Sequence, residues 1–231
     1  AEQFDINRED QDQFAYSSQQ RTAAAQAKGY FAKEIVPVTI PQRKGDPIII
    51  DTDEHPRAST TLEALAKLKG VVKADGTVTA GNASGINDGA AALLIASDEA
   101  IAQYQLKPRA KIIAATTVGI EPRIMGFAPA SAIKKLLKRA NLTIDQMDVI
   151  ELNEAFAAQA LACTRDLGLQ DDDVRVNPNG GAIALGHPLG ASGARLVTTA
   201  LNQLEQTGGK YALCSMCIGV GQGIALIIER V

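Results

Sequence analysis

The stretch from Asn177 to Arg195 reads NPNGGAIALGHPLGASGAR, and it has the strongest local pattern in the sequence. Five glycines and two prolines surround a single histidine, His187. Glycine permits two backbones to approach closely, and proline is common in the first turn of a helix. We therefore predict a tight loop that leads into a long helix from Pro188 to about Gln206, with His187 at the start of that helix.

His187 is the first candidate functional residue. The positive end of a helix dipole favours a neutral imidazole, which is the form that a general base or a donor to an oxyanion requires. A lone histidine is more often a structural residue between packed segments. The glycine-dense loop around His187 favours the catalytic interpretation.

Helix-like and strand-like segments alternate along the chain, which predicts an α/β protein. The expected helices cover residues 7–29, 61–68, 98–104, 131–140, 154–167 and 188–206. The expected strands cover residues 34–40, 47–50, 90–96, 111–118, 149–152, 174–176, 211–218 and 224–231. The last two form an antiparallel pair around a glycine-rich turn. The turn from Gln105 to Pro108 is the best candidate for a domain boundary.

The composition excludes several classes of function. The 23 Lys and Arg residues against 26 Asp and Glu residues give a net charge of −3, so nothing indicates nucleic acid or an anionic membrane as a partner. The apolar runs are too short to cross a bilayer, and the first residues do not resemble a signal peptide. Three cysteines do not make a disulfide framework, so we expect a cytoplasmic protein.

The stretch from Cys214 to Gly223, which reads CSMCIGVGQG, is a second candidate site. A redox pair is disfavoured because C-x-x-C pairs lie where a strand gives way to a helix, whereas here one strand leads to another. A zinc site lacks further ligands at suitable spacing, so no metal is expected. The remaining interpretation places Cys217 at the end of a strand beside a cleft, where its thiol can exchange a proton with a substrate carbon. Cys163 and Cys214 are expected to be inert core residues.

Two further segments have the composition of a site. Asn153 lies where a buried strand turns into a helix, and α/β proteins form sites at such edges. Asn153 fits an N-cap as well as a ligand for water or a substrate oxygen, and Glu154 fits an acid in the first turn.

Residues 76–89, which read GTVTAGNASGINDG, fit a loop that lines a ligand or a plain surface loop. The glycines of residues 219–223 do not fit a nucleotide fingerprint, because no helix follows them.

These blocks together resemble the thiolase family, in the family's order and at about its spacing. The matching segments are residues 77–88, 153–159, 177–195 and 217–223, so the resemblance covers essentially the whole chain. It implies the thiolase fold, in which mixed five-stranded sheets are covered by helices and a loop domain holds coenzyme A. It also implies an acyltransferase that cleaves a 3-oxoacyl-CoA with coenzyme A, or catalyses the reverse Claisen condensation.

The resemblance assigns roles to particular residues. His187 matches the histidine that activates the nucleophilic cysteine, and Asn153 matches the asparagine that fixes a water, which with His187 forms an oxyanion hole. Cys217 matches the acid/base cysteine, and the Gly219 N–H matches a donor of the second oxyanion hole. The expected contacts with coenzyme A come from four residues: Arg57, Ala80, Ser84 and Phe156. Coenzyme A is a substrate here, and no covalently bound cofactor is expected.

The sequence departs from the family in one respect, since nothing matches the nucleophilic cysteine of the amino-terminal thiolase domain. The resemblance therefore implies a partial chain. Residues 1–89 are expected to form part of the loop domain, residues 90–108 the end of the amino-terminal domain, and residues 109–231 the carboxy-terminal domain. We expect the isolated chain to be inactive, with the missing amino-terminal part as its partner, and the whole enzyme to be a homodimer or homotetramer.

Substrate choice follows from finer details of the resemblance. Residues 53–55, 211–214 and 216–223 are most similar to degradative thiolases of the 3-oxoadipyl-CoA type, which act in the breakdown of aromatic compounds. A fatty-acid β-oxidation thiolase and an acetoacetyl-CoA thiolase are the nearest alternatives. Ketoacyl synthases are disfavoured, because they use two histidines where this family has His187 and Cys217. For the isolated chain, a non-catalytic module that binds coenzyme A or another subunit is a further alternative.

Overall fold

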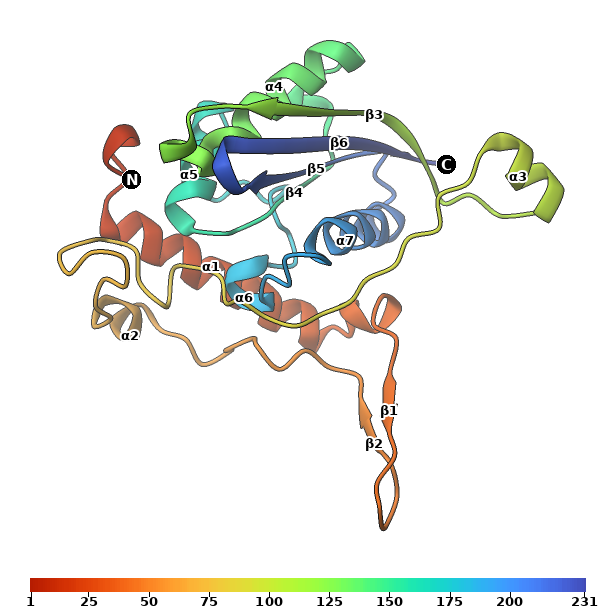
Figure 1. Ribbon diagram of the computed structural model, residues 1–231, viewed down its shortest axis with the longest axis horizontal. Coiled ribbons are helices and arrows are strands. Elements are labelled where there is room, and N and C mark those ends of the chain that lie inside the picture. The colour runs from red at the N-terminus through yellow and green to blue at the C-terminus, as the bar shows by residue number, and fades with distance from the viewer.

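The computed structural model describes residues 1–231, and a mixed β-sheet lies at its centre (Figure 1). Its strands are β3 (Ala110–Gly119), β4 (Val149–Leu152), β5 (Tyr211–Ile218) and β6 (Gln222–Arg230), in the order β3-β6-β5-β4. β4 and β5 are parallel, and the other neighbours are antiparallel. A single parallel bridge from Ile150 to Val176 extends the sheet beyond β4, at the position of a fifth strand.

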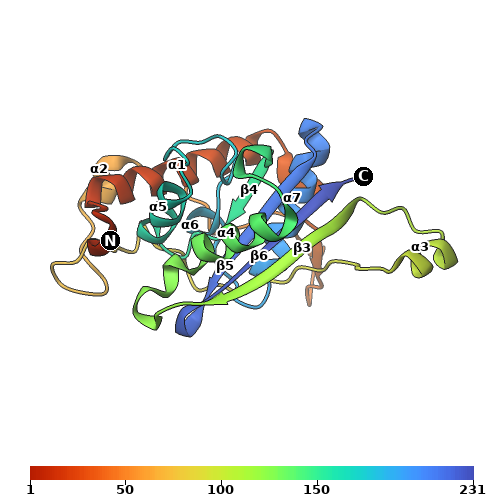
Figure 2. The same cartoon turned by 90° about the horizontal axis from the view of Figure 1, so that it is seen from above.

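One helix covers each face of this sheet, with α4 (Ala128–Ala140) on one side and α7 (Ser192–Thr207) on the other (Figures 1 and 2). The alternation of side chains along β5 divides the core accordingly. Leu213 belongs to the cluster with Ile133 and Leu136 of α4, whereas Cys214 belongs to the cluster with Leu196 of α7. These two clusters confirm the predicted α/β architecture.

Four of the other helices pack together beside the end of the sheet at which β4 and β5 finish, whereas α3 lies apart from the body (Figure 1). α1 (Arg8–Ala27) begins at Asn7, whose side chain accepts a hydrogen bond from the Asp10 N–H, and it ends just before Gly29, which has a φ of 67°. α1 packs against α2 (Leu62–Ala66), α5 (Ala157–Asp166) and α6 (Ala182–Leu185). These contacts bring residues from the first third of the chain against the loops that follow β4 and precede α7.

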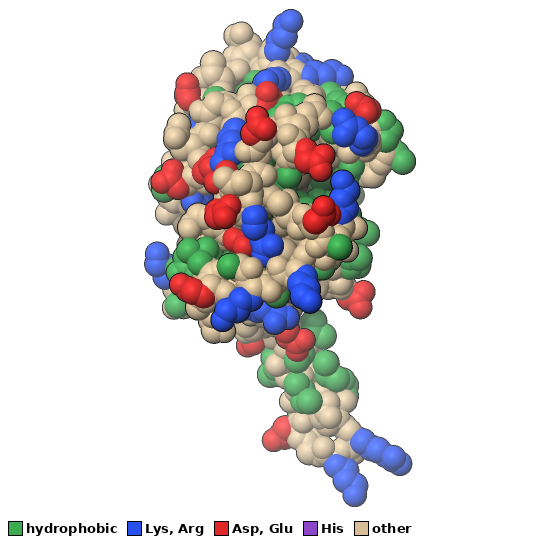
Figure 3. Space-filling view, turned by 90° about the vertical axis from the view of Figure 1, so that its left-hand side faces the viewer, with side chains coloured by type: hydrophobic (Ala, Val, Ile, Leu, Met, Phe, Trp, Pro, Cys, Tyr) green, Lys and Arg blue, Asp and Glu red, His purple; other side chains and the backbone are tan.

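A two-stranded hairpin projects from this body (Figures 1 and 3). β1 (Val38–Ile40) and β2 (Ile48–Ile50) pair in antiparallel register, and all six of their residues are exposed. An isolated hairpin has little stability of its own, and clustered apolar side chains on a surface mark contact sites. The space-filling view shows apolar side chains along the hairpin and basic side chains at its tip.

The run from Ala90 to Ala96 was predicted to be a strand, and the structure gives it no strand partner. It leads instead as an extended connection to α3 (Asp98–Tyr104), and Leu94 and Ile95 are 82% and 72% exposed. A strand exists only where a neighbouring backbone accepts and donates its hydrogen bonds. The sequence has the composition of a buried strand, but this chain supplies no neighbour.

Several boundaries also differ from the predictions, since β1 begins at Val38, α4 begins at Ala128, and residues 174–176 form only the single bridge at Val176; two further differences lie beside the candidate site. The helix after the glycine-rich loop begins at Ser192 rather than at Pro188, because residues 188–191 form a turn before it. α5 begins at Ala157 with Phe156 as its N-cap, so Asn153 is not the cap and Glu154 is not in the first turn. None of the helices combines the length and apolar composition that crossing a membrane requires.

Candidate active site

Asn153 and His187, from segments 34 residues apart, meet beyond the end of β4. The Asn153 N–H donates to the Ser215 carbonyl at 3.0 Å, which fixes its backbone beside β5. Its side-chain Nδ2 lies 3.3 Å from His187 Nε2. Asn153 is fully buried, and its Oδ1 has no protein partner, so the amide keeps an acceptor for another group.

The His187 imidazole is engaged at both nitrogens. Nδ1 lies 2.6 Å from Ser192 Oγ, in the first turn of α7, and Nε2 faces Asn153. Burial lowers the pKa of His187, and the nearby Arg195 cation lowers it further. The neutral form is therefore favoured, as predicted, although the reason is different. His187 precedes α7 by five residues, so desolvation and Arg195 replace the helix dipole as the cause.

The segment from Asn82 to Asn87 holds both loops in place. It pairs with the Asn153 loop through an antiparallel bridge between Ala83 and Phe156. It pairs with the other loop at His187, whose N–H donates to the Gly85 carbonyl and to Asn87 Oδ1 at 3.2 and 3.1 Å. This segment, here called the strap, thus connects the Asn153 loop to the His187 loop.

Cys217 lies near the end of β5, at the same edge of the sheet. β4 and β5 are in parallel register with Leu152 opposite Ser215, so Cys217 lies two residues beyond the end of that pairing. Its side chain is 7% exposed, and burial raises the pKa of its thiol, which keeps it protonated at neutral pH. The bond to the Ser215 carbonyl places the Asn153 backbone beside β5, two residues before Cys217, and the Asn153 side chain contacts His187 directly.

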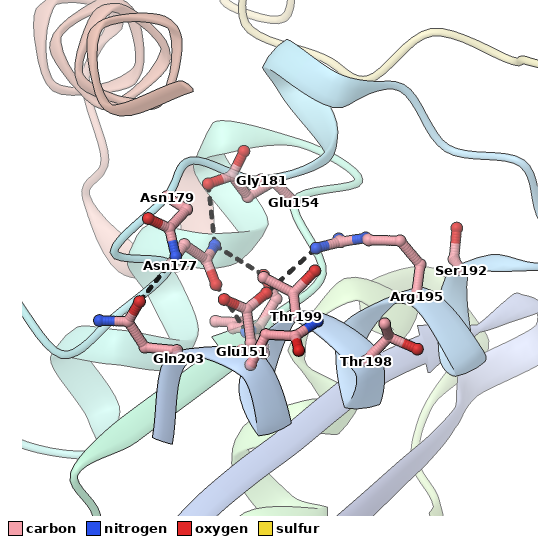
Figure 4. Close-up of polar contacts among 12 residues, drawn as sticks. Glu151, Glu154, Asn177, Asn179, Gly181, Ser192, Arg195, Thr198, Thr199 and Gln203 are labelled. Carbon is pink, nitrogen blue, oxygen red and sulfur yellow. Dashed lines mark hydrogen bonds and ion pairs between the residues drawn. The ribbon is translucent and has the colours of Figure 1, made fainter. Parts of the chain in front are cut away.

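A buried polar network lies behind these residues (Figure 4). The Glu154 carboxylate accepts hydrogen bonds from Ser18 Oγ at 2.7 Å, from Asn177 Nδ2 at 2.8 Å and from the Ile183 N–H at 3.1 Å. Burial raises the pKa of Glu154, while these donors oppose the shift. Glu154 therefore ties α1 and the glycine-rich loop to the end of β4. This role could not be predicted from sequence, since the donors lie 23 to 136 residues away from Glu154.

A second carboxylate of the network, Glu151, is fully buried and faces Arg195 of α7 at 3.1 Å (Figure 4). Burial raises the pKa of this carboxyl despite the neighbouring guanidinium. Removing one member of a buried ion pair leaves the other charge uncompensated. Because burial raises the pKa of Glu151 to about 8, the carboxyl favours its neutral form at physiological pH, and the positive charge of Arg195 still acts on His187.

The other predicted residues lie around this centre at different depths. Gly219 is exposed in the turn after β5, and a Cβ added there would meet nothing within 4 Å. Ser84 and Phe156 lie together where the strap meets the Asn153 loop, and the Ser84 N–H donates to the Ala155 carbonyl at 3.0 Å. Phe156 also lines a cavity of about 800 Å³ with Met125 and Gln159. Ala80 and Arg57 are exposed, and no contact joins them to the centre.

The chain belongs to the thiolase family. Residues 106–230 match the family described as "Thiolase, C-terminal domain", and residues 1–99 match "Thiolase, N-terminal domain". The fold and the grouping of Asn153 and His187 agree with that membership.

Three individual relatives support membership of the thiolase family. The "Beta-ketoadipyl-CoA thiolase" of Acinetobacter baylyi is 91% identical over all 231 residues. The crystal structure of an acetyl-CoA acetyltransferase from Bacillus anthracis superposes on the whole chain with a TM-score of 0.95 at 43% identity, over 58% of its own length. Human mitochondrial 3-ketoacyl-CoA thiolase, solved in complex with CoA, gives a TM-score of 0.90 at 44% identity, over 57% of its length. The chain spans 58% of the length of the A. baylyi relative.

Proposed function

We propose that the complete protein is a thiolase that cleaves 3-oxoadipyl-CoA with coenzyme A to succinyl-CoA and acetyl-CoA, or catalyses the reverse condensation. This chain supplies its base, His187, and its acid/base thiol, Cys217. The observation that carries the proposal is the contact between Asn153 and His187 at the strand edge where Cys217 also lies. The family membership supports the same chemistry.

His187 Nε2 first takes the proton from a nucleophilic cysteine thiol. A neutral imidazole is required for that transfer, and the lowered pKa of His187 provides it at physiological pH. The thiolate then attacks the 3-oxo carbonyl carbon, whose oxygen becomes an alkoxide. We propose that the Gly219 N–H donates a hydrogen bond to this oxygen, and the open space around Gly219 in the turn after β5 supports this role.

The bond between C2 and C3 then breaks, and its electron pair passes to C2 as an enolate of acetyl-CoA. His187 and Asn153, or a water bound to Asn153, donate to the enolate oxygen. Removing one donor from such an oxyanion site costs about 3–4 kcal/mol of transition-state stabilisation. Cys217, held as a neutral thiol by burial, delivers a proton to C2 and completes acetyl-CoA. The thiol of a second coenzyme A then takes the acyl group from the nucleophile.

Replacing Cys217 with alanine in the complete protein should separate these steps. We expect the variant still to become acylated on its nucleophile, while exchange of deuterium from D2O into the methyl group of acetyl-CoA falls by about a hundred-fold or more. Mass spectrometry detects both the acyl-enzyme and the exchanged acetyl-CoA. Cys163→Ala is the matched control, because burial raises the pKa of Cys163 to about 12 and keeps it an inert thiol. Exchange at the normal rate in the Cys217 variant would exclude its acid/base role.

The nucleophile itself would come from the part of the complete protein that this chain does not include. Of the three cysteines here, Cys163 and Cys214 are buried among core side chains with raised pKa values, which makes them poor nucleophiles. The exposed apolar run from Ala90 to Ala96 fits a strand that completes a sheet of that other part. The chain alone should then lack thiolytic activity.

The 3-oxoadipyl-CoA specificity is supported by the A. baylyi relative, a beta-ketoadipyl-CoA thiolase that is 91% identical to this chain. In the complete protein, we expect kcat/KM for 3-oxoadipyl-CoA to exceed that for 3-oxohexanoyl-CoA by about ten-fold or more. The two substrates differ only in the distal carboxylate, and one charge-assisted hydrogen bond is worth about 1.5–3 kcal/mol. Equal or faster cleavage of 3-oxohexanoyl-CoA would instead favour a fatty-acid thiolase.

Ser84 and Phe156 meet beside the catalytic loops, which supports a role in holding the pantetheine arm of coenzyme A. Ala80 is proposed to contact the same arm, and Arg57 the phosphates of coenzyme A. The human relative was solved with CoA bound. A cytoplasmic homodimer or homotetramer is proposed, and the apolar surface of the β1–β2 hairpin supports a contact with another subunit.

A further inference from the structure

We propose that Ser192 is a positioning residue for His187, holding Nδ1 through its hydroxyl so that Nε2 is the nitrogen that exchanges protons with the substrate side of the site. The distance from His187 Nδ1 to Ser192 Oγ is 2.6 Å. This proposal rests on the proposed thiolase function for the role of Nε2. Its geometry, however, can be tested without measuring any turnover.

The hydroxyl of Ser192 has a second partner that fixes its direction. Ser192 Oγ lies 3.1 Å from the carbonyl oxygen of Pro188, which can only accept a hydrogen bond. When the hydroxyl donates to that carbonyl, its oxygen accepts the proton of His187 Nδ1. A neutral imidazole with its proton on Nδ1 has its lone pair on Nε2, as a base at that position requires.

The opposite side of the ring agrees with this assignment. Asn153 Nδ2 is a donor, and it lies 3.3 Å from Nε2, where it meets a lone pair rather than a second N–H. When Nε2 gains a proton during the reaction, Nδ1 keeps its own proton and its bond to Ser192. The serine therefore serves the neutral and the protonated ring without any movement of the side chain.

The position of Ser192 makes it a firm support. It is 1% exposed and begins α7, the helix that is packed along the sheet and held at Arg195 by Glu151. The His187 ring is thereby held by a buried residue of α7 and not only by its own glycine-rich loop. In metal sites, the group that accepts a hydrogen bond from the second nitrogen of a ligating histidine typically contributes about 10- to 100-fold to activity. A similar contribution is expected from Ser192, because the His187 ring must also keep one tautomer.

The test is nitrogen NMR of the complete protein with 15N-labelled histidine, recorded above the pKa of His187 and assigned by loss of the signal in His187→Gln. We expect a protonated Nδ1 and an unprotonated Nε2. The proton on Nε2 in the wild-type protein would overturn the proposal, whether or not the protein proves to be a thiolase. A protein with this tautomer but no thiolytic activity would overturn the proposed function instead.

Ser192→Ala gives the second measurement. We expect kcat for thiolysis to fall by about ten-fold or more with KM for coenzyme A unchanged, and the Nε2-protonated tautomer to become visible. Thr198→Val is the matched control, because the Thr198 hydroxyl makes the same type of bond, to the Ala194 carbonyl at 3.0 Å, without touching His187. Equal kcat in the two variants, with the His187 tautomer unchanged, would contradict the role of Ser192. The wild-type spectrum remains decisive should Ser192→Ala fail to fold.

Discussion

Replacing His187 with alanine in the complete protein is expected to lower kcat for thiolysis by about three orders of magnitude. The ring would be lost both as the base for the nucleophilic thiol and as a donor to the enolate. A general base contributes about 10²–10⁴-fold, and an oxyanion donor about 10²–10³-fold, but groups that act together are not additive. Steady-state and single-turnover kinetics with 3-oxoadipyl-CoA measure the change.

The free energy of unfolding should change little in this variant, because His187 is only partly buried and leaves no unpaired charge. Binding of coenzyme A, measured by calorimetry, should also remain close to that of the wild-type protein. A variant that binds and folds normally but turns over slowly locates the loss in the chemical steps. A decrease in kcat of less than ten-fold would mean that His187 does not act as the base.

The largest expected effect on stability comes from Gly180→Ala. Gly180 has a φ of 79°, a conformation that costs a residue with a Cβ about 1–2 kcal/mol. An added Cβ would also lie 2.6 Å from the Ser18 carbonyl oxygen of α1 and closer still to Thr22 Oγ1. We expect the free energy of unfolding to fall by about 3 kcal/mol or more, since backbone strain and the clash with α1 add together.

Gly190→Ala in the same glycine-rich segment is the control for Gly180→Ala. A Cβ at Gly190 meets nothing within 4 Å, and its φ is not in the left-handed region. Urea unfolding of the two variants should therefore differ strongly, with Gly190→Ala within about 0.5 kcal/mol of the wild-type protein. Similar stabilities for the two variants would show that α1 does not pack against Gly180 as described.

Local patterns were sufficient to predict most elements of the sheet and the helices on it. β4 at Val149–Leu152 and α3 at Asp98–Tyr104 have the predicted bounds, and the β5–β6 pair follows from two apolar runs around a glycine turn. Such elements depend on periodicity and turn residues within a short window. The start of α7 was wrong by four residues, because Pro188 was equally suited to a turn before the helix.

The centre of the site could be predicted only in part. His187, Asn153 and Cys217 came from their motifs, and the structure shows the contact between the first two. Glu154 was interpreted as a first-turn acid, since its actual donors on α1 and in the glycine-rich loop are distant in the sequence. The motif did not single out Ser192, although its position five residues after His187, near a predicted helix start, was a usable signal.

The run from Ala90 to Ala96 shows a different limit. Its composition predicts a buried strand, and the structure leaves Leu94 and Ile95 exposed. Strand propensity reports how well a segment fits a half-buried pleated surface, and the surface must be supplied by other strands. The strand prediction therefore requires neighbouring strands that these 231 residues do not supply. The chain spans 58% of the length of the A. baylyi relative.

A crystal structure of the complete protein with acetyl-CoA bound tests most directly whether His187, Asn153 and Cys217 serve one reacting centre. We predict the thioester oxygen within about 2.7–3.1 Å of His187 Nε2, or of a water held by Asn153, with the methyl carbon facing Cys217 Sγ. A thioester bound away from His187, or with Cys217 Sγ turned to the opposite side of the sheet from the methyl group, would contradict the assignment.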